Sequence, residues 1–321
     1  MKLEVIVQNA NGEMFDVSEL CVSATYDTHI ADQPGRLVVE VMEDPTKAIS
    51  FANGDVIFMN VGDAGMFYGY IFSMKTEENR TVEITAYDQS RYLKNDDVFA
   101  TPPMTADVIF ENCCRRAGLS KFEAKCRPRY ICPEYFHDKK SLYSIIKYGI
   151  ERTFENEGRR LFVRDDFGSL IFDDVKNQRV DAVIGDASLL YGYKSEISID
   201  RDTFNLARIY KDDETFGKRI AWEAGDKESQ KRWGVLSYVK RADKDMNAAQ
   251  MAELSERILR VKNRETRSLS LQTLGDARFK AGMSFDVGIS RLGIRGEFVA
   301  ESVTHRFYKG EYVMSMGVFS A

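Results

Sequence analysis

Short runs of alternating apolar residues, divided by turn-forming residues, dominate the first part of the chain. The runs are Leu3–Val7, Leu37–Val41 and Val82–Ala86, and the turn signals include Asn11-Gly12, Gln33-Pro34-Gly35 and Asn53-Gly54. A strand with one buried face points every second side chain toward the core, and closely spaced turns join such strands into antiparallel sheets. Residues 1–95 are therefore predicted to form an antiparallel β-barrel or β-sandwich.

Residues 96–188 show a mixed pattern. Thr105 and Ser141 are predicted to cap two helices that end near Gly118 and Gly158. A turn at Asp165–Gly168 separates two short apolar strands. This pattern predicts a small α+β domain.

Strand patterns return over residues 189–321 and are interrupted by an amphipathic helix predicted at 244–263. Its apolar stripe, at steps of three and four, is Met251, Leu254, Ile258 and Val261. A chain of 321 residues exceeds the usual size of one core, so two or three domains are expected. The predicted fold class is β-rich α+β, with two β-domains flanking the α+β domain.

The two β-regions share a phrase. FANGDVIFMNV, from Phe51, and FKAGMSFDVGI, from Phe279, both run Phe, two residues, Gly, two residues and a large apolar residue. The first Gly permits the positive φ of a strand-entry corner, and a later Gly suits a bulge or close approach. The predicted repeat positions are Phe51, Gly54, Gly69, Phe279, Gly282 and Gly296. Chance is the alternative, because Gly and Phe are common in this chain.

Composition gives little reason to expect a nucleic-acid or membrane partner. The formal net charge is −5, so there is no bulk attraction to DNA or anionic lipid. The sequence has no apolar run of membrane-spanning length. The N-terminus lacks the features of a signal peptide, which predicts synthesis and folding in the cytosol or export by a route that needs no signal.

No motif nominates a catalytic residue or a cofactor-binding residue, and both are predicted to be absent. The acidic pairs Asp165-Asp166 and Asp173-Asp174 flank predicted strands, where they are turn formers first and acid/base candidates second. Cys113, Cys114, Cys126, Cys132 and His137 fall close together in the sequence, which leaves a metal cluster open. Their spacing matches no tight Cys-x2-Cys knuckle, so buried thiols are favoured and no metal is predicted.

Four segments carry a family resemblance. They are Asp226–Arg241 (DKESQKRWGVLSYVKR), Thr105–Leu119 (TADVIFENCCRRAGL), the Arg-Asp-x-x-Gly-x-Leu hairpin at Arg164–Leu170, and Asn205–Ile209. In their order along the chain they resemble the baseplate hub proteins of contractile tails. These are the late control D and XkdQ-like families of phages, prophages and tailocins.

The resemblance implies a structural hub. Residues 1–95 and 189–321 would be two tube-like β-domains flanking the α+β insert at 96–188. Three copies would then present six similar domains, a pseudo-sixfold ring that adapts a hexameric tail tube to a trimeric spike.

The implied partners are the homotrimer itself, the tail tube protein, the spike or tip protein, and baseplate wedge or LysM-type tail proteins. DNA would pass through the lumen without sequence-specific binding. Assembly is expected in the cytoplasm of the host bacterium, and the final location in the baseplate of a virion or tailocin.

Two alternatives of other classes stay open. One is a tail-associated cell-wall hydrolase that uses a carboxylate pair of the α+β domain, such as Asp165 or Asp173. The other is a β-rich module that binds host glycans.

Overall fold

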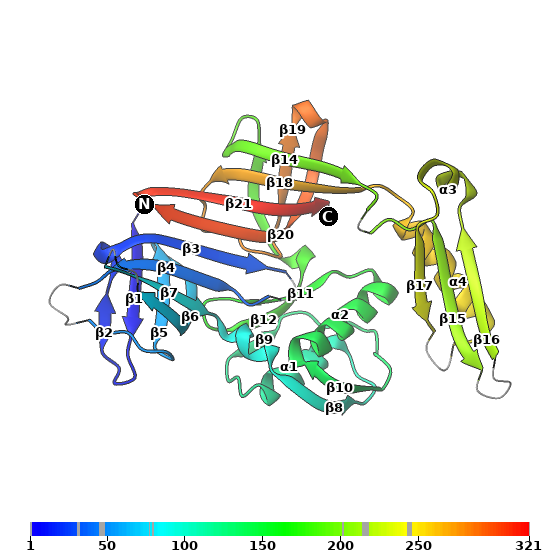
Figure 1. Ribbon diagram of the computed structural model, residues 1–321, viewed down its shortest axis with the longest axis horizontal. Helices are drawn as coiled ribbons and strands as arrows, with labels where there is room; N and C mark the ends of the chain where they lie inside the picture. Colours follow the sequence, from blue (N-terminus) through cyan, green and yellow to red (C-terminus); the bar gives the residue numbers. More distant parts are fainter. Residues whose placement is uncertain are drawn as a thin grey trace. The chain divides into compact units, whose positions relative to one another are not determined.

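A computed structural model describes residues 2–30, 33–44, 49–76, 78, 80–200, 202–213, 218–242 and 246–320 (Figure 1). The chain divides into two compact units. The first consists of Met1–Lys194 and Ser270–Ala321, and the second is Ser195–Leu269. The prediction of a β-rich α+β fold is confirmed. Within the described residues, no helix combines the length and the apolar character needed to span a membrane.

The first unit begins with a group of strands that we call the first β-module. Its elements are β1 (Leu3–Gln8), β2 (Met14–Asp16), η1 (Ser18–Leu20), β3 (Cys21–His29), β4 (Arg36–Met42), β5 (Val56–Val61), β6 (Ala64–Thr76), β7 (Thr81–Tyr87) and η2 (Gln89–Lys94). Alternation decides which face is buried: Leu37, Val39 and Val41 of β4 are inaccessible to solvent, whereas the residues between them are half-buried. The turn predicted at Asn11-Gly12 lies between the paired strands β1 and β2, which form a hairpin.

The α+β region follows, with two helices beside short strands. Its elements are β8 (Asp96–Thr101), α1 (Ala106–Arg116), β9 (Phe122–Ala124), β10 (Tyr135–Ser141), α2 (Leu142–Glu157), β11 (Leu161–Asp165), β12 (Leu170–Asp174) and η3 (Val175–Asn177). Ser141 caps α2 as predicted, because its side chain accepts a hydrogen bond from the Ser144 amide, and Gly158 ends the helix with φ 69°. Thr105 precedes α1, but its side chain makes no capping hydrogen bond.

The remaining strands of the first unit form what we call the second β-module. They are β13 (Arg179–Gly185), β14 (Leu190–Ser198), β18 (Thr266–Leu274), β19 (Ser284–Ile289), β20 (Ile294–Tyr308) and β21 (Glu311–Ser320), with η4 (Ser290–Leu292) between β19 and β20. The boundary with the second unit falls inside β14 and β18.

The second unit is a three-stranded sheet with a helix packed against it. Its elements are β15 (Leu206–Asp213), β16 (Lys218–Gly225), α3 (Lys227–Trp233), β17 (Ser237–Arg241) and α4 (Ala248–Lys262), and the strand order is β16-β15-β17. Met251 and Leu254 of α4 are buried against Ile209 of β15. Part of the predicted helix start, residues 244 and 245, lies outside the described residues; α4 itself begins after Asn247, which forms a capping box with Gln250.

Candidate functional site: the junction between the two β-modules

The two β-modules have the same strand order. The first is ordered β3-β4-β7-β6-β5-β1 and the second β14-β18-β21-β20-β19-β13. Along the chain, each order is produced by three strands followed by a β-meander of a six-residue strand and two longer ones. The modules differ at the last position, where β1 pairs antiparallel with β5 but β13 pairs parallel with β19.

Gly54 and Gly282 occupy like corners of the two modules. Their φ angles are 95° and 87°, a region that L side chains rarely adopt. The Gly54 amide donates to the carbonyl oxygen of Ile71 at 2.8 Å, and the Gly282 amide donates to that of Ala300 at 2.8 Å. In each module the residue after the glycine accepts the return bond at 2.9 Å. In each module, these two hydrogen bonds therefore hold the residues before a short strand (β5 or β19) against the middle of the long strand that follows it (β6 or β20).

The strand irregularities follow the same equivalence. The pairing of β6 with β7 shifts register between Ile71 and Ser73, and the pairing of β20 with β21 shifts between Ala300 and Ser302. In both modules the bulge comes directly after the residue that accepts the glycine bond. A bulge bends a strand, so β6 and β20 bend at corresponding points.

The other predicted repeat positions are less alike. Phe279 is fully buried against Phe285, with ring centroids 5.0 Å apart, whereas Phe51 is partly buried at the edge of the first core. Gly69 and Gly296 stand at different register positions, opposite Ile57 and Val287 respectively. The residue of the second module that corresponds to Gly69 is Phe298, which pairs with Phe285, because Gly69 and Phe298 each stand two residues before the bulge. Gly296 stands two residues earlier than Phe298.

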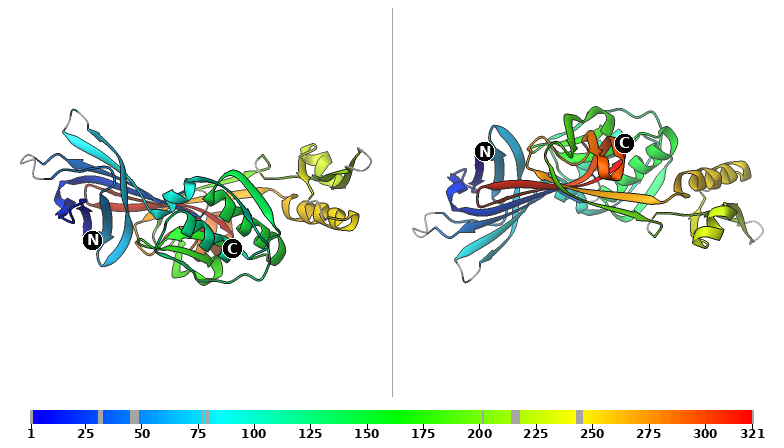
Figure 2. Two further views of the ribbon diagram at one scale, coloured as in Figure 1. Left: turned by 90° about the horizontal axis from the view of Figure 1, so that it is seen from below. Right: turned by 90° about the horizontal axis from the view of Figure 1, so that it is seen from above.

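A direct strand pairing joins the two modules. Seven residue pairs connect β20 to β3 in antiparallel fashion, from Ser302 opposite His29 to Tyr308 opposite Ser23. Figure 1 shows β3 beside β20, and Figure 2 shows the same blue and red strands side by side from below and above. We call this pairing the module junction.

Side chains reinforce the module junction. Thr304 Oγ1 donates to Asp27 Oδ1 at 2.7 Å on the solvent side. On the buried side, Thr28 Oγ1 donates to the Val303 carbonyl at 3.4 Å and accepts from the Ala281 amide at 3.1 Å. Thr28 thus links a strand of the first module to two segments of the second.

His305 is a structural residue of the module junction. Its Nε2 donates to the Phe279 carbonyl oxygen at 2.8 Å, and its Nδ1 accepts from the Tyr312 hydroxyl at 2.9 Å. Burial lowers the pKa of His305 to about 4, so the ring is neutral at pH 7 and this donor and acceptor pattern is maintained. Its ring also stacks on Tyr26, with centroids 6.0 Å apart.

The β11–β12 hairpin contacts the second module. Arg164 Nη1 donates to the Ala281 carbonyl oxygen at 2.8 Å, and Lys280 Nζ lies 3.2 Å from Asp166 Oδ1. Gly282 leaves room for the ring of Phe162, since a Cβ at Gly282 would lie 2.9 Å from it. The corner glycine therefore also serves the packing of the α+β region.

The tip of the same hairpin contacts the first module. Gln89 Nε2 donates to the Gly168 carbonyl oxygen. The ring of Phe167 packs edge-on to Tyr68, with centroids 6.0 Å apart, and a Cβ on Gly168 would lie 2.8 Å from the Tyr68 ring. The Arg164–Leu170 segment therefore contacts both modules, and we call its tip, Arg164–Gly168, the keystone turn.

Two buried carboxyl groups lie at this point. Asp88 accepts from the amides of Gly35 and Ser90 at 2.8 and 2.9 Å, and burial, followed by the charge of Asp165, raises its pKa well above the ordinary range. Burial raises the pKa of Asp165 to about 6, although a hydrogen bond of 2.7 Å from the Gly168 amide opposes the rise. The second oxygen of Asp165 has no hydrogen-bond partner among the described residues.

Three comparisons place this architecture among known proteins. The profile of the YqbQ-like protein family matches residues 24–319. The chain belongs to the YqbQ-like family. The predicted resemblance to XkdQ-like proteins is thereby confirmed.

Named relatives share most of the length of this YqbQ-like chain. It is 25% identical to the uncharacterised protein YqbQ of Bacillus subtilis and 23% identical to the phage-like element PBSX protein XkdQ of the same organism. Both alignments span 272 residues, 84% of this chain and 82% of the relative. The fold is similar to that of a 43 kDa tail protein of prophage MuSo2 from Shewanella oneidensis. The TM-score is 0.73 at 12% identity, over 99% of this chain and 98% of the other.

The acid/base candidates of this YqbQ-like chain are buried and accept hydrogen bonds from neighbouring residues. Asp165 and Asp173 are 4% and 2% exposed. Asp173 accepts hydrogen bonds from Asn177 Nδ2 at 2.8 Å and from Gln178 Nε2 at 2.7 Å. Their oxygens stabilise turns, as the sequence favoured, and do not face an open cleft.

The four cysteines of the α+β region pack in its core. Cys113, Cys114, Cys126 and Cys132 are all buried, and burial raises their thiol pKa values, to about 12 for Cys113 and about 11 for Cys132. His137 instead lies beside Thr101, with Nε2 3.1 Å from the hydroxyl oxygen. Within the described residues, no group of three or more His, Cys, Asp or Glu side chains is arranged to hold a metal ion.

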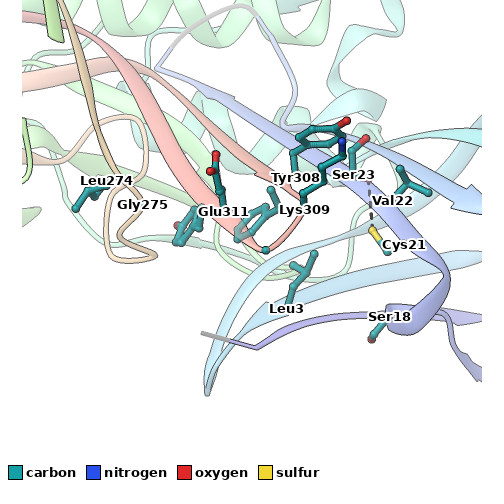
Figure 3. Close-up of a pocket in the computed structure, with 13 residues that line it drawn as sticks. Leu3, Ser18, Cys21, Val22, Ser23, Leu274, Gly275, Tyr308, Lys309 and Glu311 are labelled. Atoms are coloured by element: carbon teal, nitrogen blue, oxygen red, sulfur yellow. Dashed lines mark hydrogen bonds between the residues drawn. The ribbon is translucent and has the colours of Figure 1, made fainter. Parts of the chain in front are cut away.

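An open pocket of about 420 Å³ lies at one end of the module junction (Figure 3). Its walls come from the start of β3, the end of β18 and the β20–β21 turn; Figure 3 labels Cys21, Ser23 and Lys309 among the lining residues. Burial and the charge of Glu40 raise the Cys21 pKa to about 11, so little of its thiol is ionised at neutral pH and its nucleophilic reactivity is low.

Sequence reasoning missed the module junction, Asp88 and Lys280. The Arg-Asp-x-x-Gly-x-Leu segment was noticed as a family feature, which was a signal for the keystone turn. Asp88 carried no comparable signal, because a single Asp after a strand is typical of an ordinary turn.

Proposed function

We propose that the protein is a structural component of a phage-type contractile tail, a baseplate hub in which three copies form a ring of six similar β-modules. The names of its relatives and fold neighbours support the tail assignment, since these include a phage-like element protein and a prophage tail protein. In this ring the modules are tube-like domains: residues 1–95, and residues 179–185 and 189–321 with the second unit inserted. Residues 96–178 are the α+β insert, because β13, which the sequence placed in the insert, pairs with β19 of the second module.

The module junction is the observation that supports the proposed ring. Two modules of the same strand order are joined side by side within one chain by a seven-pair antiparallel ladder. A heterologous contact of this kind closes into a ring when the rotation between neighbours divides a full turn. Three chains then supply six modules, which match a hexameric tube on one side and a trimeric spike on the other.

The ring explains the expected partners and location. A tail tube protein stacks on the six modules, a spike or tip protein binds the threefold side, and wedge or LysM-type tail proteins attach outside. The net charge of −5 agrees with a lumen through which DNA passes without sequence-specific binding. Assembly takes place in the host bacterial cytoplasm, and the particle is a virion or a tailocin.

The buried state of Asp165 and Asp173 gives no support to the hydrolase alternative. A carboxylate that serves as a general acid or base must reach the substrate, and both of these groups are buried.

Native mass and negative-stain electron microscopy of the full chain test the ring. At high protein concentration we expect a trimer whose projection shows six lobes around a central opening. A stable dimer, or a monomer that persists over the whole concentration range, contradicts the ring.

A further inference from the structure

A second open pocket, of about 570 Å³, lies beside the module junction. Its walls come from the end of β3, the start of β4, the end of β7, and η2. The titratable residues that line it are Asp27, His29, Arg36, Tyr87, Arg91 and Lys94. Segments that are separated in the sequence therefore bring their titratable side chains to one hollow in the first β-module.

The pocket carries more positive than negative charge. Arg36, Arg91 and Lys94 are cationic at pH 7, and Asp27 is the one acidic residue among the described residues that line it. Burial lowers the pKa of His29, so its ring is neutral at pH 7. With three positive charges and one negative charge, the lining has a surplus of two positive charges.

Asp27 does not neutralise this surplus, because both of its carboxylate oxygens already have partners. Oδ2 accepts hydrogen bonds from Arg36 Nε and Nη2 at 3.3 and 3.0 Å, and Oδ1 accepts one from Thr304 Oγ1 at 2.7 Å. Within the part of the chain that the structure describes, Arg36 Nη1 has no acceptor. Asp27 therefore holds the Arg36 guanidinium at the pocket wall and leaves one of its amino groups available.

Arg91 and Lys94 supply the charge that is not paired. They are three residues apart in η2, and side chains at that spacing in a 3-10 helix lie on the same face. The Arg91 guanidinium carbon lies 5.4 Å from the centre of the Phe72 ring, and the Tyr87 ring packs edge-on against the same ring. Lys94 is exposed, and neither cation forms an ion pair with another described residue.

We propose that this pocket binds a small oxyanion of the phosphate class, held by Arg36, Arg91 and Lys94. A guanidinium donates in a fork that matches two phosphate oxygens, and a lysine adds a compact positive charge. A free or terminal phosphate group carries about two negative charges near pH 7, which equals the surplus of the lining. A backbone phosphate of a nucleic acid carries about one charge and matches it less well.

A bound anion would connect two parts of the fold. Arg91 and Lys94 belong to η2, which leads directly into β8 of the α+β region, whereas Arg36 belongs to β4, the neighbour of the junction strand β3. An anion shared by these side chains would hold the start of the α+β region against β4. This site lies within one chain, so the proposal does not depend on the ring.

Isothermal titration calorimetry of the full chain with pyrophosphate tests the site. The ionic strength is kept constant, so that general screening of surface charge does not change during the titration. We expect saturable binding of a single pyrophosphate per chain. Lys94→Gln changes an exposed residue and is expected to leave the fold unchanged, while the affinity falls about tenfold through loss of a charge-assisted hydrogen bond. Lys94→Arg keeps the charge and should keep the affinity.

A matched pair of double variants separates the pocket from the rest of the surface. The pocket variant is Arg91→Gln with Lys94→Gln, and the control is Lys121→Gln with Arg291→Gln. Lys121 and Arg291 are exposed and do not line the pocket, so the control loses the same charge elsewhere. The control should bind pyrophosphate as the wild type does. Equal weakening in both double variants would overturn the site, because it would show attraction to the surface charge as a whole.

Two further outcomes decide the proposal. If the wild type shows no saturable binding of pyrophosphate, the site is overturned. A single-stranded DNA oligonucleotide offers backbone phosphates in place of a free phosphate, and we expect it to bind more weakly than pyrophosphate. Tighter binding of the oligonucleotide, lost in the pocket variant, would overturn the assignment to a small oxyanion and indicate a nucleic-acid backbone as the ligand.

Discussion

Thr304 donates a hydrogen bond of 2.7 Å to Asp27, although the two residues come from opposite ends of the chain. The bond lies on the solvent side of a seven-pair strand ladder that joins two β-modules of the same strand order. A linker would permit the modules to reorient, whereas a shared sheet fixes the second module on the first.

The two corner glycines are expected to differ in their sensitivity to alanine. Gly54→Ala places a side chain at φ 95° in open space and is expected to cost about 1–2 kcal/mol in the free energy of unfolding. Gly282→Ala adds a contact of 2.9 Å with the Phe162 ring, so we expect a larger loss, roughly 3 kcal/mol. Urea unfolding followed by circular dichroism measures both.

Gly288→Ala is the matched control for the glycine pair. Gly288 lies within β19, its φ is not positive, and no atom lies within 4 Å of the added Cβ. Its effect should be smaller than that of either corner variant, and an equal loss at Gly288 and Gly282 would contradict the corner explanation.

Arg164→Met is expected to loosen the keystone turn. The side chain is buried and donates to the Ala281 carbonyl and to Gln178 Oε1, at 2.8 and 3.2 Å. Removing a buried charged donor leaves its acceptors unpaired, for an expected loss of roughly 3 kcal/mol. Arg164→Lys keeps the charge without the forked geometry and should fall between Arg164→Met and the wild type.

The control for Arg164 is Arg179→Met, which removes an exposed arginine that pairs with Asp286 and Glu297. Exposed pairs contribute little to stability, so its unfolding midpoint should stay close to that of the wild type. Similar losses in Arg164→Met and Arg179→Met would show that the buried contacts of Arg164 are unimportant.

The pH dependence of stability should report the ionisation of Asp165. Burial raises its pKa to about 6 in the folded protein, so the folded state holds the proton more tightly than the unfolded state does. The contribution of Asp165 to stability is then fully present below pH 4 and is lost as the pH rises through about 6. The neutral variant Asp165→Asn, which retains an oxygen for the Gly168 amide, should gain stability relative to the wild type between pH 4 and pH 8, by about 3 kcal/mol at most.

Asp186→Asn gives a dependence of the opposite sign. Hydrogen bonds from Ser290 lower the pKa of Asp186, so its contribution is present above the ordinary Asp pKa and is lost as the pH falls. Thermal unfolding of both variants and the wild type from about pH 2 to about pH 8 measures the two trends, because Asp186 titrates below the ordinary Asp pKa and Asp165 above it. A pH-independent difference between Asp165→Asn and the wild type would show that Asp165 titrates normally.

Thiol titration should distinguish buried cysteines from a metal cluster. In the folded protein, 5,5′-dithiobis(2-nitrobenzoic acid) is expected to react slowly and only with Cys21, since the four other thiols are buried. All five thiols should react in denaturant, and elemental analysis should find no stoichiometric zinc. Zinc release on denaturation would instead support the cluster that the sequence left open.

The local sequence pattern predicted the helices and strands more successfully than it predicted which strands pair with each other. Ser141 and Gly158 mark the ends of α2 because caps are determined by neighbouring residues. The pairing of β20 with β3 joins residues at least 273 positions apart (302 − 29 = 273), and period-2 alternation says which face is buried without saying which strand edges pair. The repeat phrase located Gly54 and Gly282 in like corners, but Gly69 and Gly296 do not correspond. Gly69 stands two residues before the last paired residue ahead of the bulge in β6, whereas Gly296 stands four residues before it in β20.

The module junction also has a mechanical consequence. The pairs between β3 and β20 lie along the strand direction, so a pull along these strands loads all seven pairs together in shear. Such a ladder resists sliding far better than it resists peeling from one end, because peeling breaks one rung at a time. A particle that must withstand contraction of its tail is best served when the load runs parallel to these strands.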